Sequence, residues 1–126
     1  MTSDITPLIP EGRKVIEAYG DGGFKVTLER IKGSMIIFPE QAIAWKVSCF
    51  EEITLESFQS IVDAHDMVDV LLIGCGQQQQ FLAPDLERAL RQKGIVPEVM
   101  DTGAACRTYN VLLSEERRAA AALIAV

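Results

Sequence analysis

Two apolar runs separated by a helix-like segment constrain the fold of this chain more than any other feature. The first run, Val70–Ile73, breaks into the loop Gly74–Gly76, and the second, Ile95–Met100, ends at Asp101. The first run is apolar on both faces, as expected for a strand that is covered on two sides. Residues 68–101 therefore predict a β-loop-α-β unit with two neighbouring parallel strands.

Signals for a crossover helix lie between the two runs. Pro84 suits the first turn of a helix, because its missing N–H would have no partner there, and Gly94 suits the helix end. The carboxyl ends of both strands then meet at one rim of the sheet, where open α/β sheets usually hold ligands.

The first third of the chain predicts antiparallel β structure. Residues 13–28 are rich in β-formers interrupted by Gly20–Gly23, which indicates two strands joined by a tight turn. A second pair of strands covers residues 35–47, with its turn at Pro39-Glu40.

Three more helices are predicted from apolar spacing and capping residues. Thr54 caps a helix that ends near His65-Asp66, and Asp101 or Thr102 caps a helix with Tyr109 on its inner face. Ser114 caps a last helix, in which Glu115 and Glu116 occupy the first turn and residues 119–126 offer small side chains for packing.

Length and composition predict one soluble domain over residues 1–126, with residues 1–12 as an irregular N-terminal arm. A chain of 126 residues can bury a real core, and 48% apolar with 24% charged residues is ordinary for a globular protein. The net charge of −6 comes without a basic stripe. Nucleic acid and anionic membranes are therefore poor partners.

Cysteine usage predicts a reducing compartment. Cys49, Cys75 and Cys106 are an odd number at wide spacing, and the chain has one histidine. Neither a disulfide framework nor a structural zinc site fits this pattern. No leader is evident, and no apolar stretch reaches the ~18 residues of a membrane span. We expect a cytoplasmic protein without a metal.

A nucleotide site at the rim is weakly indicated. Gly74-Cys75-Gly76 begins like a dinucleotide fingerprint, but its third glycine would fall at Gln79, and the helix starts only at Pro84. The alternative is that the glycines allow a sharp exit from a buried strand. Asp101 could hydrogen-bond a ribose hydroxyl, but a helix cap is the preferred interpretation. We expect no cofactor.

Cys75 has two interpretations, a nucleophile in a strand-loop turn or a small semi-buried residue. The only histidine, His65, is expected at the opposite end of the strand. At ~3.3 Å per residue, this places it ~20 Å from Cys75. We favour the small buried residue and predict no catalytic residue. His65 itself is expected at the edge of the core.

Polar residues nevertheless gather around the predicted rim and define a candidate surface for a ligand or a partner. A solvated loop and helix face is the alternative interpretation. The candidate residues are Gly74, Cys75, Gly76, Gln77, Asp101, Thr102, Arg107, Thr108 and Asn110.

Three phrases in this order resemble one family. They are Tyr19-Gly-Asp-Gly-Gly-Phe24, Ile73-Gly-Cys-Gly76 and Asp101-Thr-Gly-Ala-Ala-Cys-Arg-Thr-Tyr-Asn-Val-Leu112. The chain, over roughly residues 15 to 125, is similar to the small-domain family that includes mitochondrial complex I assembly factor 3 and uncharacterised bacterial and archaeal proteins. It departs from the expected pattern at Cys75, where Thr or Ser is expected, and at Gly103-Ala104, where the mitochondrial version has what looks like Pro-Asn.

The resemblance implies a three-layer α/β fold. A central mixed sheet with the parallel β-α-β core would carry helices on one side and a smaller β-containing layer, from the N-terminal third, on the other. It also implies an accessory or assembly factor that acts through a protein partner, without an agreed enzymatic reaction. The alternative is a small-molecule or anion binder, or a minor enzyme, that uses the loop Gly74–Gln80. A homodimer stays open, because antiparallel strands often leave an edge for a second copy.

Overall fold

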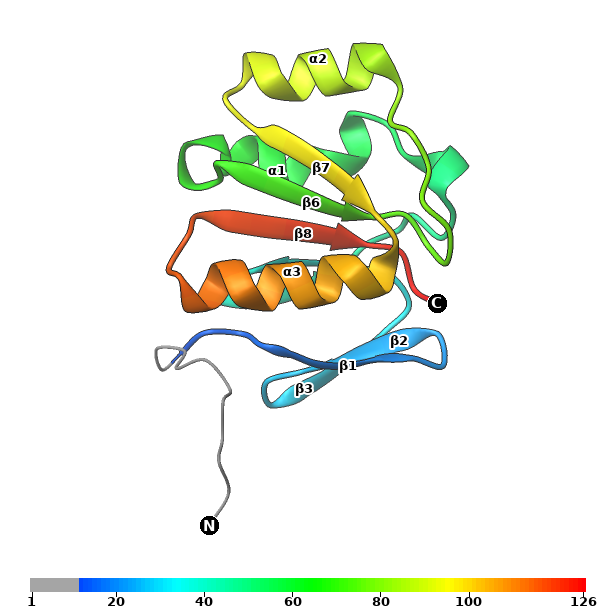
Figure 1. Ribbon diagram of the computed structural model, residues 1–126, viewed down its shortest axis with the longest axis vertical. Helices are drawn as coiled ribbons and strands as arrows, with labels where there is room; N and C mark the ends of the chain where they lie inside the picture. The colour runs from blue at the N-terminus through cyan, green and yellow to red at the C-terminus, as the bar shows by residue number, and fades with distance from the viewer. Residues whose placement is uncertain (1–11) are drawn as a thin grey trace.

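The computed structural model describes residues 12–126, which form a three-stranded and a five-stranded sheet (Figure 1). The small sheet has the order β1-β2-β3 and the central sheet the order β5-β4-β8-β6-β7. The irregular arm predicted for residues 1–12 lies outside the described residues except for Gly12.

The small sheet confirms the predicted N-terminal hairpin and adds a strand. Its strands are β1 (Ile16–Gly20), β2 (Gly23–Val26) and β3 (Glu29–Lys32), all antiparallel. Asp21 and Gly22 form a two-residue turn in which both have positive φ, 52° and 77°, as a type I′ hairpin requires. The second turn was not predicted. It places Leu28 at φ 64° with 94% of its surface exposed, so this residue turns the chain and does not pack.

The second predicted hairpin is confirmed, but its second strand is shorter than predicted. Strands β4 (Met35–Phe38) and β5 (Gln41–Ala44) pair antiparallel around Pro39-Glu40. The chain leaves the sheet at Trp45, whose buried indole stacks on Phe58 with ring centroids 5.6 Å apart. The indole N–H also donates to the Ser57 carbonyl oxygen at 2.8 Å, while the Trp45 backbone N–H still donates to the Ser34 carbonyl oxygen at 2.9 Å.

The helix predicted from Thr54 to His65-Asp66 is divided into short pieces. They are the 3₁₀ turns η1 (Phe50–Glu52), η2 (Glu56–Phe58) and η3 (His65–Met67) and the α-helix α1 (Gln59–Asp63). The Thr54 hydroxyl accepts the Ser57 N–H at 3.2 Å, but the residues that cap η2 and α1 are Leu55 and Phe58, so Thr54 is not the predicted helix cap. His65 is exposed, and the expectation of a core-edge imidazole was wrong.

The β-α-β unit is confirmed. Strands β6 (Val70–Gly74) and β7 (Val96–Met100) pair in parallel, and α2 (Pro84–Gln92) connects them. Residues 71–74 of β6 are buried, as a strand between two neighbours and two covering layers must be.

The last predicted helix is wrong, because residues 119–123 form a strand. After α3 (Thr102–Ser114), strand β8 (Ala119–Leu123) enters the sheet between β4 and β6, parallel to β6 and antiparallel to β4. Alanine is the best helix former. Here all five residues of β8 are buried on both faces of a central strand, so tertiary packing decides the conformation.

Ser114 ends α3 and caps no new helix. The Arg117 N–H donates to the Leu112 carbonyl oxygen at 3.0 Å, and the Glu116 N–H to Leu113 at 3.0 Å. This pair of bonds is a Schellman motif. Its left-handed position, usually glycine, is Glu116 at φ 58°.

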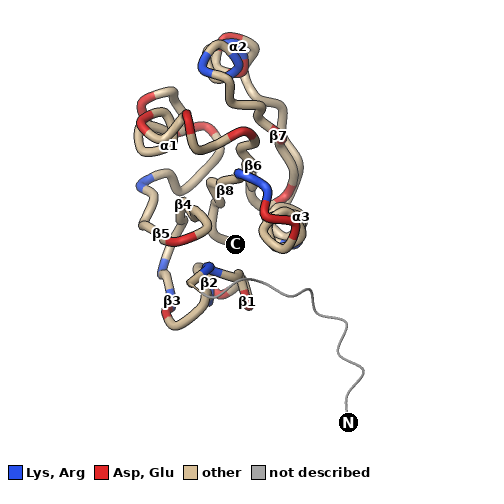
Figure 2. Tube along the Cα trace, turned by 90° about the vertical axis from the view of Figure 1, so that its left-hand side faces the viewer, with Lys and Arg blue, Asp and Glu red and all other residues tan. Residues whose placement is uncertain are grey.

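The predicted fold class is confirmed as a layered α/β fold around a mixed sheet. Figure 2 shows β6 and β8 between α1 on one side and α3 on the other. One core cluster packs Trp45, Phe58 and Leu90 against the face of the sheet that α1 covers. Another packs Phe24 and Tyr109 against the face that α3 covers. The small sheet and α3 therefore share one layer, so helices lie on both sides of the central sheet and not on one side as the resemblance implied.

Candidate functional site

The carboxyl ends of β6, β7 and β8 meet at one rim of the central sheet. All three strands are parallel, so their arrows in Figure 1 end on the same side, beside the β1–β2 turn. Two of these ends were predicted to meet. The third was not, because β8 was expected to be a helix.

Gly74 permits close contact between β6 and α3. A Cβ atom at Gly74 would lie 2.8 Å from Leu123 Cδ2 and 3.0 Å from the Thr102 Cα atom. The glycine in the apolar run is therefore needed for packing at the rim.

Thr102 joins the β6 loop to the end of β8. Its N–H donates to the Gly76 carbonyl oxygen at 2.8 Å, and its hydroxyl accepts the Gly76 N–H at 3.0 Å. The same hydroxyl donates to the Ile124 carbonyl oxygen at 2.7 Å. Thr102 is fully buried, so these bonds are shielded from water.

The Cys75 thiol shapes the loop from inside. It is 4% exposed and lies 3.1 Å from the Gln78 carbonyl oxygen and 3.2 Å from that of Met100. The Gln80 N–H donates to its sulfur at 3.2 Å. Burial raises the pKa of the thiol, which disfavours the thiolate that a nucleophile needs.

Asp101 caps α3. Its carboxylate accepts the Ala104 N–H at 2.9 Å, which settles the choice between Asp101 and Thr102 for the cap. The first turn of α3 is thus held by the Asp101 carboxylate and by the bonds between Thr102 and Gly76 of the β6 loop.

The β1–β2 turn lies against the same rim. A Cβ atom at Gly103 would come within 2.5 Å of the Tyr19 hydroxyl, so the phenol lies directly over this glycine. Arg107 Nη1 donates to that hydroxyl at 3.4 Å. The Gly22 N–H donates to the Val126 carbonyl oxygen at 2.9 Å, so the turn is also tied to the segment after β8.

Between these elements lies a shallow hollow of about 410 Å³, which we call the rim hollow. It is lined by Tyr19, Gly20, Asp21, Gly76, Gln77, Asp101, Gly103 and Val126. Each of the three phrases identified in the sequence contributes to this lining. Sequence reasoning missed Tyr19 and Asp21 as site residues, although they stand inside the first phrase.

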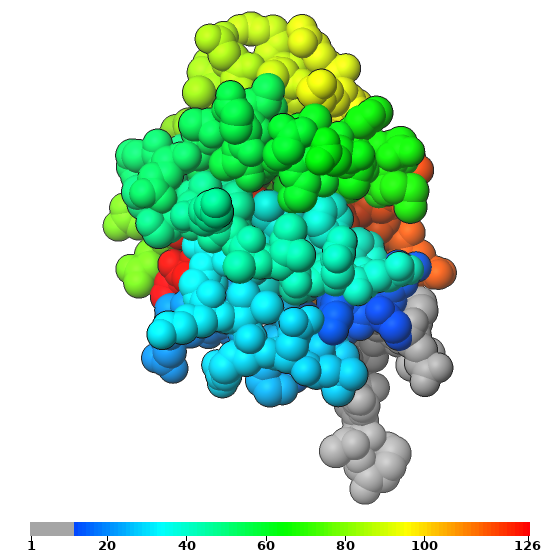
Figure 3. Space-filling model, turned by 180° about the vertical axis from the view of Figure 1, so that it is seen from behind, coloured from blue at the N-terminus to red at the C-terminus, as the bar shows by residue number. Residues whose placement is uncertain are grey.

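A second hollow, of about 310 Å³, lies on the other side of the β6 loop. It shares Gly76, Gln77 and Val126 with the rim hollow and reaches Cys49 and Phe50. In Figure 3 the C-terminal residues, in red, reach the surface among segments from the N-terminal third and the middle of the chain.

Not every candidate residue belongs to the rim. Asn110 Oδ1 accepts the Ile16 N–H at 3.0 Å and Nδ2 donates to the Ile16 carbonyl oxygen at 2.9 Å, so this amide fastens β1 to α3. Thr108 is half-buried on α3 and lines neither hollow. The remaining candidates are brought together, with Arg107 joined through Tyr19.

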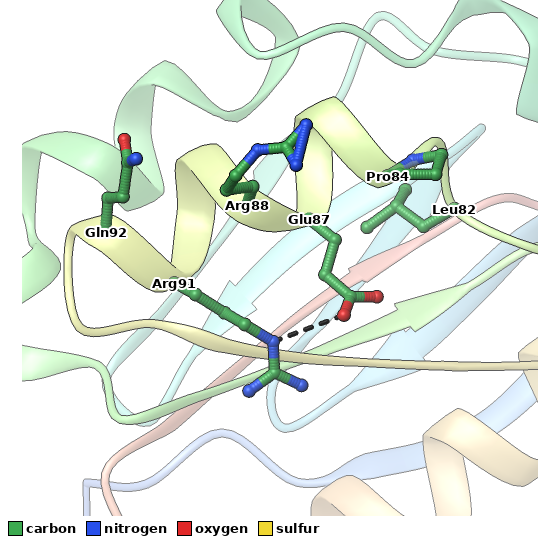
Figure 4. A pocket seen from close by; sticks show the side chains of 6 residues that line it. All are labelled: Leu82, Pro84, Glu87, Arg88, Arg91 and Gln92. Atoms are coloured by element: carbon green, nitrogen blue, oxygen red, sulfur yellow. Dashed lines mark hydrogen bonds and ion pairs between the residues drawn. The ribbon is translucent and has the colours of Figure 1, made fainter.

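A separate hollow of about 540 Å³ lies along α2. Figure 4 shows it lined by α2 and by Leu82, two residues before α2, with Arg91 and Glu87 pointing toward each other in an ion pair of 3.2 Å. Such an i,i+4 pair is ordinary for a solvated helix face. We therefore place the candidate site at the rim.

Two kinds of feature are absent from residues 12–126. No group of three His, Cys, Asp or Glu side chains converges there in a way that could hold a metal ion. None of the helices in this part of the chain is both long enough and apolar enough to cross a bilayer.

Residues 16–124 match the family described as "Protein of unknown function (DUF498/DUF598)". The chain belongs to this family. The match confirms the resemblance carried by the three phrases.

Among curated relatives, NADH dehydrogenase (ubiquinone) 1 alpha subcomplex assembly factor 3 of Xenopus tropicalis is 36% identical over 109 residues, 86% of this chain. The Bos taurus protein of the same name is 37% identical. This chain spans about 60% of the length of these relatives. An uncharacterised protein of Rhodobacter capsulatus is 35% identical over 90% of this chain and 86% of its own length.

Solved structures share the fold. A Bartonella henselae protein described as an outer membrane protein has a TM-score of 0.85 at 39% identity, covering 94% of this chain and 99% of that one. A Bordetella pertussis protein described as a Mth938-like domain has a TM-score of 0.83 at 29% identity, covering 99% and 92%.

Proposed function

We propose that this chain is a non-enzymatic accessory or assembly factor that binds a protein partner through the rim. The eukaryotic relatives carry the name of a complex I assembly factor, which supports the proposal. We also propose that this chain shares the activity of those longer proteins and takes part in complex I assembly.

The observation that carries the proposal is the convergence of the three phrases on the rim hollow. Its lining combines the half-exposed phenol of Tyr19 with the carboxylates of Asp21 and Asp101. The Arg107 guanidinium adjoins the phenol. Tyr and Arg are enriched where proteins bind one another, because each offers both contact area and hydrogen bonds.

Affinity purification from the native host tests the proposal with two matched variants. Arg107→Ala removes a guanidinium at the rim, and Arg88→Ala removes one from the exposed face of α2. The same partner should co-purify with the unaltered chain and with Arg88→Ala, but not with Arg107→Ala. Equal recovery with all three, or no reproducible partner, would refute the role of the rim.

The alternative is a small-molecule or anion binder, or a minor enzyme, at the loop Gly74–Gln80. It is favoured by the two hollows on either side of the loop, whose volumes fall in the range of small-ligand sites. It predicts a thermal shift with an anion, nucleotide or metabolite. Arg107→Ala is the variant to use, because Asp101→Ala would also remove the cap of α3.

We include self-association in the proposal, because an open sheet edge is a surface that a second copy can cover. A cytoplasmic location is also part of the proposal, and fractionation of the native host with an antibody would test it.

A further inference from the structure

The central sheet has two edge strands, β7 and β5, and they differ in how their outer edges are covered. An uncovered edge presents a row of unpaired N–H and C=O groups, which invites another strand.

The β7 edge is protected. The Val96 N–H and the Met100 carbonyl point inward and bond across to the β6 side, so alternation turns Pro97 and Val99 outward. Pro97 has no N–H to offer, which is a common way to blunt an edge. Gln79 Nε2 donates to one of the remaining outward groups, the Val99 carbonyl oxygen, at 3.4 Å.

Among the described residues no strand pairs with the outer edge of β5, although β3 of the small sheet lies close to β5. The Trp45 N–H donates to the Ser34 carbonyl oxygen at 2.9 Å, which fixes the phase of the antiparallel ladder with β4. Alternation then turns the N–H and C=O groups of Ala42 and Ala44 outward. No hydrogen bond within residues 12–126 engages these groups. Neither residue is buried, and both side chains are small.

This edge is complementary to itself. In an antiparallel pairing of two copies about a twofold axis at Ile43, Ala42 of one copy lies opposite the partner's Ala44. These are the residues with outward groups, so each pair can exchange both of its N–H···O=C bonds. The two Ile43 side chains then lie opposite each other on one face, where β-branched residues pack well. In each copy, Ile43 and Phe38 line a hollow of about 730 Å³.

The charges at the two ends of β5 fit the same register. Glu40 and Lys46 lie just outside β5, three residues before and after Ile43, so a twofold axis at Ile43 places the end of β5 that carries Glu40 beside the end that carries the partner's Lys46. The Glu40 side chain is 79% exposed, and its ion-pair partner in its own chain, Arg13, is 3.7 Å away. In each copy, the Glu40 carboxylate therefore has room for a second cation.

We propose that a second copy of this chain docks on β5 through this twofold antiparallel pairing and extends the five-stranded sheet across the interface. The inference rests on the self-association part of the proposed function. It does not depend on the rim, which is built from the ends of β6, β7 and β8, whereas β5 is the edge strand that β4 separates from β8.

Sedimentation equilibrium over a concentration series from low to high micromolar tests the pairing. The mass should rise from 13.9 kDa toward twice that value. A monomer throughout would overturn this inference and leave the proposed binding of a different protein at the rim unaffected.

Charge reversal tests the register. Glu40→Lys or Lys46→Glu alone places like charges together and should weaken the dimer by about tenfold or more. The double variant should restore it to within about threefold, because the opposite charges then face each other again with the signs exchanged. Glu98→Lys makes the same charge change on the protected β7 edge and should have no effect.

Ala44→Pro removes one outward N–H without touching the inner ladder and should also lower the dimer fraction. Melting curves show whether each variant is folded. If the dimer persists unchanged in both single charge variants, it forms through another surface and the proposed pairing is wrong.

Discussion

The hydroxyl of Thr102 donates a hydrogen bond to the carbonyl oxygen of Ile124 at 2.7 Å. With the Gly76 N–H that the hydroxyl accepts, this bond fastens the start of α3 to the ends of β6 and β8. The rim is therefore built on one buried side chain that binds two separate backbone segments.

Replacing this hydroxyl should be costly. Thr102→Val keeps the shape but leaves the half-buried Gly76 N–H and the buried Ile124 C=O without this partner, so we expect the free energy of unfolding to fall by about 2–4 kcal/mol. Thr102→Ser keeps the hydroxyl and should lose only about 1 kcal/mol for the missing methyl group. Urea unfolding measures both, and equal losses would show that the hydroxyl contributes no specific stabilisation.

Gly103 and Tyr19 should be energetically coupled. Alanine at position 103 gains about 1 kcal/mol of helix propensity, but its Cβ atom would displace the Tyr19 phenol. In the Tyr19→Ala background, Gly103→Ala should therefore raise the free energy of unfolding by about 0.5–1 kcal/mol, and in the unaltered chain it should not. A double-mutant cycle from urea unfolding gives the coupling. The same gain in both backgrounds would mean that the phenol does not cover Gly103.

Glu116→Gly should stabilise the chain. Glu116 holds the left-handed position of the α3 terminus, at φ 58°, where a side chain costs about 1 kcal/mol and glycine costs less. Because glycine also loses more backbone entropy on folding, we expect a net gain of about 0.5 kcal/mol. Thermal unfolding checks it. Glu115→Gly, one residue earlier and without positive φ, should destabilise, and a loss in both variants would contradict the Schellman terminus.

The three cysteines should react in a definite order. Burial raises the pKa of Cys75, and it raises that of Cys106 to about 12, so few thiolates form at either site near neutral pH. Cys49 is exposed and should be alkylated first by iodoacetamide in the folded protein. Labelling of the buried pair should accelerate as the pH rises toward their raised pKa values. Peptide mass spectrometry reads the order, and early labelling of Cys75 would revive the nucleophile hypothesis.

The β-α-β unit could be predicted from the sequence because its signals are local and agree with one another. Pro84 and Gly94 mark the ends of α2, and the apolar runs mark the buried strands. The two strand ends that carry Cys75 and Asp101 consequently meet where predicted.

Strand β8 could not be predicted, because local preference and tertiary packing conflict there. A run of alanines favours a helix, and the usual glycine that would announce the end of α3 is replaced by Glu116. Only the narrow position between β4 and β6, which demands small side chains on both faces, makes these residues a strand. The predicted rim lining lacked Val126 for the same reason, because Val126 follows β8.

Hydrogen bonds between residues that are far apart in the sequence also escaped prediction. Asn110 was expected at the candidate surface, but its amide binds the Ile16 backbone 94 residues away in the sequence. A polar residue on a helix gives no sign of such a partner until the strand beside it is known.

We propose that the rim is the surface on which a partner protein docks. The most direct test places a photo-crosslinking amino acid at the exposed position of Gln77, beside the rim hollow, and in a second chain at Arg88 on α2. After irradiation of living cells of the native host, we predict a discrete adduct with one protein from position 77 and none from position 88. No adduct from position 77, or the same adduct from both positions, would contradict the account.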